Sequence, residues 1–192
     1  VQNPKTLLMD EPLSNLDARL RLSIREEIRN IVKDVGVTTI FVTHDQEEAL
    51  SISDYIALID EGVIQQYDIP QNLYLEPANL FVAKFIGNPI INTYDMEYQN
   101  GKLISKDFSL DISDFDHGRF KEELKKETYT IGIRPEHFKF DDNGINVKVD
   151  NIEMIGRYMI LHFNLNGIPS RMIADSKLKI EKDDIIKIAI DY

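Results

Sequence analysis

The sequence predicts an α/β segment followed by an all-β segment. Up to residue 87, runs of β-branched and apolar residues alternate with an amphipathic helix, as is typical of a parallel sheet with crossover helices. From Ile90 on, short strand-like runs are separated by turn residues, including Asn-Gly pairs. Gly87-Asn88-Pro89 separates the two patterns, so we place the domain boundary there, with one domain over 1–87 and a second over 88–192.

Two parallel strands joined by a helix are expected first. The runs 6–9 and 37–42 consist of β-branched or apolar residues, and both predict buried strands. Between them, apolar residues recur every three or four positions, which predicts a helix over 17–35. Gly36 is expected to end this helix as a C-cap.

A second helix is expected to begin after Asp45, whose side chain can cap it, and to run to about Ser53. Glu47 and Glu48 fall in its first turn, where carboxylates complement the helix dipole. We interpret both as solvated.

The rest of the first domain predicts a hairpin and two short helices. Strands are expected at 55–60 and 63–67, joined by a two-residue turn at Glu61-Gly62. Pro70 favours the start of a helix to Leu75, and Asn79 favours the cap of a last helix that ends before Gly87.

The sequence of the second domain predicts an all-β fold with one short helix at 120–126. Many short strands with glycine turns are typical of a small barrel of the oligonucleotide-binding (OB) type. The expected strands are 92–98, 102–104, 128–134, 145–154, 158–165, 168–173 and 185–190.

Composition excludes some classes of function. The 192 residues contain 22 Lys and Arg against 33 Asp and Glu, a net charge of −11, which argues against a nucleic-acid surface even in an OB-like barrel. The sequence contains no apolar run long enough to span a bilayer, so direct membrane insertion is not expected. The sequence contains no cysteine and its histidines are scattered, so a zinc site is not expected.

The candidate functional residues lie where the first two predicted strands end. Asp10 and Glu11 follow the first strand, and Thr43 and His44 follow the second. Parallel strands present their carboxyl ends at one edge of a sheet, where nucleotide-binding folds place their ligands. A metal-holding acid, a general base and an imidazole able to meet a phosphate oxygen are therefore available together. Alternatives are that Asp10 only caps the following turn and that His44 is a hydrogen-bonded core histidine.

The order and spacing of these motifs closely resemble the ATP-binding-cassette (ABC) ATPases of solute importers. The matching segments are Leu-Met-Asp-Glu-Pro-Leu-Ser-Asn-Leu-Asp at 8–17 and Val-Thr-His-Asp-Gln-Glu-Glu-Ala-Leu at 42–50, and the likeness extends over 3–87. Ile-Gly-Ile-Arg-Pro-Glu-His at 131–137 resembles a motif of the transport-associated (TOBE) barrel that follows many of these ATPases. The resemblance implies the remnant of a P-loop NTPase domain followed by an OB-like regulatory barrel.

The resemblance also implies residue roles, with ATP and Mg²⁺ as cofactors. Asp10 would hold Mg²⁺ through water, because this cation keeps much of its hydration shell. Glu11 would orient and deprotonate the attacking water, and His44 would contact the γ-phosphate. Ser14 and Asp17 match the D-loop, which crosses to a second ATPase subunit in that family.

Two segments of the family pattern do not occur in this sequence. There is no G-x-x-x-x-G-K-[ST] phosphate loop and no Leu-Ser-Gly-Gly-Gln signature. We therefore expect the chain to be the C-terminal part of a longer ATPase and to neither bind nor hydrolyse ATP usefully alone. An uncovered strand at 6–9 would also favour association with another copy.

The implied function is the ATPase subunit of a solute importer. It would act as a homodimer at the cytoplasmic face of the membrane, bound to permease subunits and supplied by a solute-binding protein. Carbohydrate or glycerol-phosphate is the expected cargo, with polyamine, iron or another small solute as alternatives. A non-catalytic regulatory or dimerisation module is the alternative from another class, and an oligonucleotide binder is disfavoured by charge.

Overall fold

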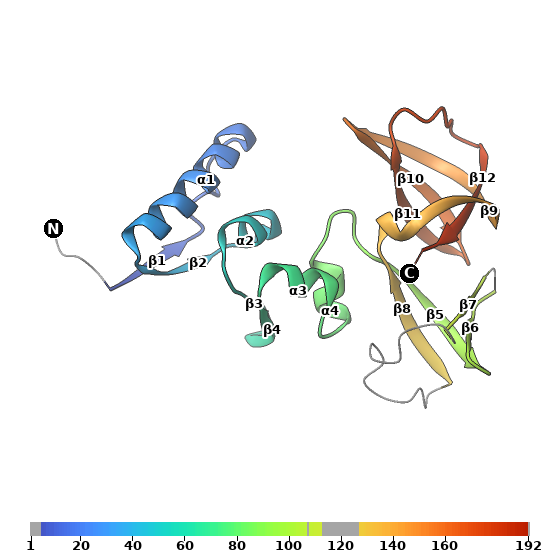
Figure 1. The fold of residues 1–192 in the computed structure, drawn as a ribbon, viewed down its shortest axis with the longest axis horizontal. Coiled ribbons are helices and arrows are strands. Elements are labelled where there is room, and N and C mark those ends of the chain that lie inside the picture. Colours follow the sequence, from blue (N-terminus) through green and yellow to red (C-terminus); the bar gives the residue numbers. More distant parts are fainter. Residues whose placement is uncertain (1–4, 107, 113–126, 192) are drawn as a thin grey trace. The chain divides into compact units, whose positions relative to one another are not determined.

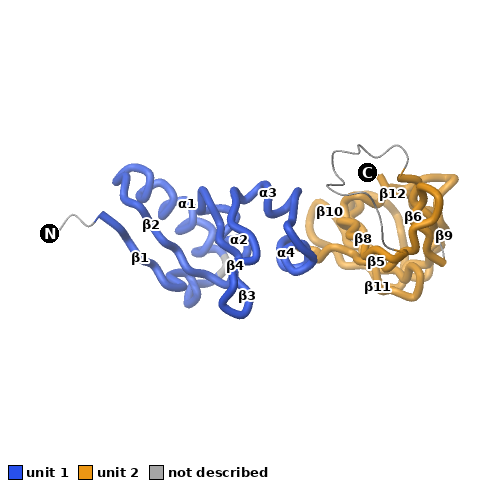
Figure 2. Tube along the Cα trace, turned by 90° about the horizontal axis from the view of Figure 1, so that it is seen from below, with its two compact units in different colours: residues 1–87 blue, residues 88–192 orange. Residues whose placement is uncertain are grey.

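The computed structural model describes residues 5–106, 108–112 and 127–191. The chain forms two compact units, Val1–Gly87 and Asn88–Tyr192 (Figure 2). Within the described residues, no helix is both long and apolar enough to cross a membrane. The helix expected at 120–126 lies outside the described residues.

Unit 1 begins with the expected strand, helix and strand (Figure 1). Strand β1 (Thr6–Asp10) pairs in parallel with β2 (Thr38–Val42), and helix α1 (Ala18–Val35) connects them. Asp17 caps α1 by accepting hydrogen bonds from two backbone N–H groups. Gly36 ends it in the left-handed conformation, with φ of 64°.

The prediction that β1 and β2 are buried is wrong. Leu8, Ile40 and Val42 point to one face of the pair and are 71%, 53% and 53% exposed. Met9 and Phe41 alternate with these residues, lie on the other face of the pair and are half-buried. The reason is that one helix covers only one face of this two-stranded sheet. Apolar runs of this kind are buried when both faces of a sheet are covered.

The remainder of unit 1 forms the predicted elements around a small core. Helix α2 (Gln46–Ile52) follows Asp45, and β3 (Ile56–Asp60) and β4 (Val63–Asp68) form a hairpin. The turn residues Glu61 and Gly62 both have positive φ, as the primed hairpin turns require. Helices α3 (Pro70–Leu75) and α4 (Leu80–Phe85) complete the unit. Its buried core consists of Ile56, Leu58, Leu73, Val82 and Ile86.

Unit 2 contains two four-stranded antiparallel sheets. One has the order β7-β6-β5-β8 and the other β11-β10-β9-β12. The strands are β5 (Asn92–Gln99), β6 (Lys102–Ile104), β7 (Ser109–Asp111), β8 (Thr128–Ile133), β9 (Phe138–Ile155), β10 (Tyr158–Leu165), β11 (Ile168–Asp175) and β12 (Ile185–Ile190), with a 3₁₀ turn at Pro135–His137. The predicted strands are present, and the two sheets confirm an all-β second part.

Two strands differ from expectation. Strand β7 was not predicted, because no hairpin signal marks it in the way that Asn100-Gly101 marks the equally short β6. Strand β9 begins seven residues before the predicted 145 and passes through Asp-Asp-Asn-Gly at 141–144, which reads as a turn. Opposite this segment, the pairing of β12 with β9 shifts register between Lys187 and Ile188. Gly144 fits only because it lacks a side chain, since a Cβ would lie 2.3 Å from the carbonyl oxygen of Ile188.

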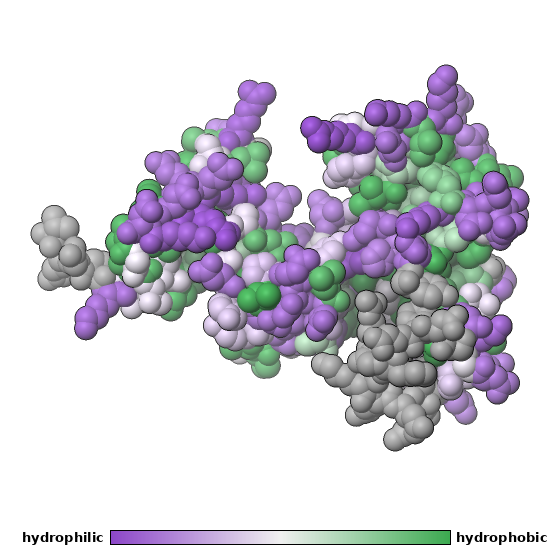
Figure 3. All heavy atoms as spheres, viewed as in Figure 1, coloured by the Kyte–Doolittle hydropathy of each residue, from purple (hydrophilic) through white to green (hydrophobic). Residues whose placement is uncertain are grey.

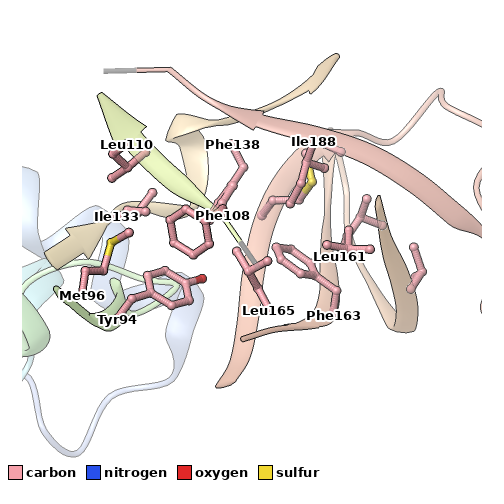
Figure 4. Close-up of a cluster of buried hydrophobic side chains, with 14 of the residues drawn as sticks. Tyr94, Met96, Phe108, Leu110, Ile133, Phe138, Leu161, Phe163, Leu165 and Ile188 are labelled. Atoms are coloured by element: carbon pink, nitrogen blue, oxygen red, sulfur yellow. The ribbon is translucent and has the colours of Figure 1, made fainter. Parts of the chain in front are cut away.

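The two sheets of unit 2 enclose one hydrophobic core (Figure 4). Tyr94 and Phe163 are among its largest side chains and are 0% and 1% exposed. A buried hydrogen bond of 2.7 Å joins the hydroxyls of Tyr94 and Ser170, and the Asn92 side chain donates to the carbonyl oxygen of Arg171. Polar groups that cross this core are thus paired, as burial requires.

Both units have apolar side chains at the surface (Figure 3), and in unit 1 they include Leu8, Ile40 and Val42 on the open face of β1 and β2. We expect the isolated chain to self-associate through the open face of β1 and β2, because uncovered strands and apolar patches favour association. Leu8 and Ile40 lie opposite each other in the strand pair. The double substitution Leu8→Glu and Ile40→Lys places opposite charges there and should restore a monomer in sedimentation velocity.

The control for this prediction is Met154→Glu, which changes a side chain 62% exposed in unit 2 and should leave association unchanged. A monodisperse monomer of the unmodified chain would contradict the prediction.

Candidate functional site

The carboxyl ends of β1 and β2 lie side by side. The parallel register places Asp10 opposite Val42. One residue further on, the backbone N–H of Glu11 donates to the carbonyl oxygen of Val42 at 2.8 Å. The backbone of the acid pair is therefore fixed to the end of the strand that leads to Thr43 and His44.

Glu11 and His44 are in direct contact. Oε1 of Glu11 lies 2.8 Å from Nδ1 of His44, and the two side chains are 46% and 74% exposed. Glu11 has φ of 42°, a left-handed conformation that is uncommon and strained for a residue with a side chain. Two hydrogen bonds, one through its backbone and one through its carboxylate, hold it there.

The contact changes the proton affinity of the imidazole. The hydrogen bond to Glu11 and its negative charge raise the pKa of His44 above 6.5, and the charges of Asp45 and Glu48 act in the same direction. A raised pKa in the folded state stabilises the fold fully below pH 6.5, and this contribution is lost as the pH rises through the folded pKa. Protonated His44 donates from Nδ1 to the carboxylate and keeps Nε2 for another partner.

Asp10 lies beside this pair with an exposed side chain. The described residues contain no group of three or more His, Cys, Asp or Glu side chains that could hold a metal ion. A single carboxylate fits Mg²⁺, which retains several water ligands and takes the rest from substrate phosphates. Asp10 is therefore a suitable oxygen ligand for that cation.

Ser14 and Asp17 have local structural roles. The Ser14 hydroxyl donates to the carbonyl oxygen of Glu11 at 2.9 Å. Asp17 caps α1, and Leu13 between them is 1% exposed. The loop after Glu11 is thus anchored at three points.

A cluster of charged residues next to His44 was not predicted from the sequence. Glu48, expected to be solvated, is 2% exposed and accepts a hydrogen bond from Thr43 at 2.7 Å. Arg25 on α1 is 6% exposed and pairs with Asp45. The signal was present, because Arg21 and Arg25 are one helical turn apart and lie off the apolar stripe, but such a pair reads equally as a solvated face.

Comparison with known proteins finds a family match in the second unit and relatives that align with most of the chain. Residues 131–185 match the family model of the TOBE domain. The chain is 39% identical over 175 residues to the sn-glycerol-3-phosphate import ATP-binding protein UgpC of a Ruegeria species, an alignment that covers 91% of this chain and 48% of that protein.

Two further relatives serve other uptake systems. The diacetylchitobiose uptake system ATP-binding protein MsiK of Streptomyces coelicolor is 44% identical over 140 residues, 72% of this chain and 36% of that protein. The osmoprotective compounds uptake ATP-binding protein GgtA of a Synechocystis species is 37% identical over 202 residues, 100% of this chain and 55% of that protein.

These findings define the class: the chain is a relative of the ABC transporter ATP-binding proteins and carries a TOBE domain. They confirm the resemblance inferred from the Asp-Glu and Thr-His motifs. The chain spans about a third to just over half of the length of these relatives, 36% to 55%.

The geometry of the pair predicts the titration of His44. In Glu11→Gln, the pKa of His44 should fall toward its ordinary value, because the neutral amide removes the negative charge. Histidine-selective NMR titration measures this shift, and Glu27→Gln, an exposed change on α1, is the matched control. An unchanged His44 titration in Glu11→Gln would show that the two side chains are not paired in solution.

Proposed function

We propose that the chain is the C-terminal part of the ATP-hydrolysing subunit of a solute importer. The single observation that carries this proposal is the Glu11–His44 contact of 2.8 Å at the common edge of two parallel strands. The names of the three relatives support it, since each describes an import or uptake ATP-binding protein. In finer terms, unit 1 is the remnant of a P-loop NTPase domain and unit 2 an OB-like barrel.

Glu11 acts as the general base in this proposal. A carboxylate activates water when it lies within hydrogen-bond reach, and the exposed carboxylate of Glu11 can be reached from solvent. The hydrogen bond to His44 orients the carboxylate. Its strained backbone and its bond to Val42 fix the direction in which the side chain leaves the strand.

His44 binds a phosphate oxygen through Nε2. Its Nδ1 faces Glu11, so the other nitrogen is directed away from the carboxylate on a ring that is 74% exposed. The raised pKa favours the protonated ring, in which both nitrogens donate. A cationic donor suits a terminal phosphate that gains charge on its outer oxygens during transfer.

Asp10 would hold Mg²⁺, and Ser14 and Asp17 belong to the loop that meets a second ATPase subunit. Bound Mg²⁺ neutralises phosphate charge. The remaining phosphate contacts come from parts of the protein outside this chain, because the sequence contains no phosphate loop. The whole protein acts as a homodimer on permease subunits at the cytoplasmic face of the membrane, downstream of a solute-binding protein.

The proposed cargo is a carbohydrate or glycerol-phosphate, as the names of UgpC and MsiK suggest by analogy. Polyamine, iron and other small solutes are the alternatives, because a binding protein and a permease recognise the cargo and the ATPase does not. A second candidate for this chain by itself is a non-catalytic regulatory or dimerisation module, favoured by the missing phosphate loop.

Glu11→Gln in the full-length protein should abolish most ATP turnover while nucleotide binding persists. Loss of a general base reduces rates by about 10²- to 10⁴-fold. Steady-state hydrolysis and nucleotide titration measure the two properties, with Glu27→Gln as the control. Turnover at the unmodified rate in Glu11→Gln would refute the assigned role.

The 192-residue chain alone should show neither ATP turnover nor micromolar nucleotide affinity. The phosphate loop supplies the backbone N–H groups and the lysine that anchor the phosphates, and these groups contribute much of the binding. Isothermal titration with Mg²⁺ and ATP distinguishes this outcome from micromolar binding, which would contradict it.

A further inference from the structure

Charged side chains of α1 converge on the residue that follows His44. Nη1 of Arg21 lies 3.2 Å and Nη2 of Arg25 lies 3.3 Å from Oδ2 of Asp45. The other oxygen, Oδ1, accepts from the backbone N–H of Glu47 at 2.8 Å and so caps α2. Asp45 therefore joins α1 to the start of α2, because Oδ2 pairs with the arginines of α1 and Oδ1 caps α2.

The residue that precedes His44 belongs to the same cluster. The Thr43 hydroxyl donates to Oε2 of Glu48 at 2.7 Å and accepts from the backbone N–H of Asp45 at 3.0 Å. Glu48 is 2% exposed, and its Oε1 lies 3.8 Å from Nε of Arg21. Both neighbours of His44 are thus held by buried or half-buried polar contacts.

His44 itself has little packing to orient it. Its side chain is 74% exposed, and within the described part of the chain Glu11 is the one side chain hydrogen-bonded to the ring. An exposed side chain samples several rotamers unless something else fixes its base. The direction of the ring therefore depends on the backbone between Thr43 and Asp45.

We propose that Arg25, assisted by Arg21, is a positioning residue for His44. It fixes Asp45 against α1, and the fixed Asp45 holds the peptide from which the His44 ring reaches Glu11. The catalytic meaning of this positioning rests on the proposed function, because it requires Glu11 and His44 to be the pair that meets water and phosphate.

Arginine suits this task better than an apolar residue would. The guanidinium of Arg25 bonds Asp45 through one nitrogen and Glu47 through the other, at 3.3 Å each. Such a rigid fork specifies direction as well as distance. A buried ion pair gains little stability over well-packed apolar residues, so geometry is the property that it supplies here.

The test is a histidine-selective NMR titration of His44 in two variants matched in chemistry. Arg25→Met removes the contact to Asp45. Arg29→Met removes another arginine of α1, which bonds the carbonyl oxygen of Ser51 at the far end of α2 and not the Asp45 carboxylate. The proposal expects Arg25→Met to lower the pKa of His44 toward the value in Glu11→Gln, and Arg29→Met to leave it unchanged.

The sign of the shift separates positioning from simple charge effects. The charged groups around His44 are Glu11 from the loop after β1, Asp45 beside it in the chain, Glu47 and Glu48 from α2, and Arg21 and Arg25 from α1. Removing the positive charge of Arg25 would by itself raise the pKa of His44, since these carboxylates would be less neutralised. A fall therefore supports the proposal, and an unchanged or raised pKa overturns it.

Arg25→Lys covers the case in which Arg25→Met does not fold. Lysine keeps the charge but lacks the fork, so His44 should show a smaller fall in pKa than in Arg25→Met, and an unchanged pKa overturns the proposal. Unchanged signals from His137 and His162 in unit 2 report on the integrity of that unit. Failure of the proposed function is seen separately, as full ATP turnover in Glu11→Gln of the full-length protein.

Discussion

The parallel pairing of β1 with β2 is the constraint on which the candidate site depends. Because Asp10 lies opposite Val42, the next residue of each strand end leaves the sheet at the same edge. A shift of one residue would turn Glu11 to the other face and break its contact with His44, since side chains alternate along a strand. The hydrogen bond from the Glu11 backbone to Val42 extends the register beyond the strand. The strained conformation of Glu11 is tolerated because this bond and the His44 contact hold it from both sides.

Local features of the sequence predicted most of the elements. Asp17, Asp45 and Asn79 all cap helices through their side chains, as their residue types indicate. The turns at Glu61-Gly62, Asn100-Gly101 and Asn166-Gly167 all contain positive φ at both residues. These outcomes depend on a few neighbouring residues, so a single sequence contains the information. Burial depends on what lies across from a segment, which is why Leu8 and Ile40 appeared buried and are exposed.

The same difference between local features and contacts with distant segments applies to the candidate site. Glu11 and His44 were predictable as neighbours, because strand order and a short crossover bring their positions to one edge. The side chains that hold them were not. Glu48 and Arg25 occupy positions where charge is ordinary on a solvated helix, and only the packing of α1 against α2 removes them from water. Strand β9 shows the same limit, because Gly144 is required by the close approach of the Ile188 backbone, 44 residues away in the sequence.

The polar cluster beside His44 also illustrates how a surface residue acquires a fixed direction. The His44 ring is 74% exposed, so burial does not orient it. The alternative is to fix the residues on each side of it and leave the ring exposed. Thr43 and Asp45 are fixed in this way by Glu48 and Arg25, both of which are buried. Precision at an exposed position is thus obtained from buried ionic contacts one residue away, and the same contacts attach the loop to α1, the helix that begins directly after the loop of Glu11, Ser14 and Asp17.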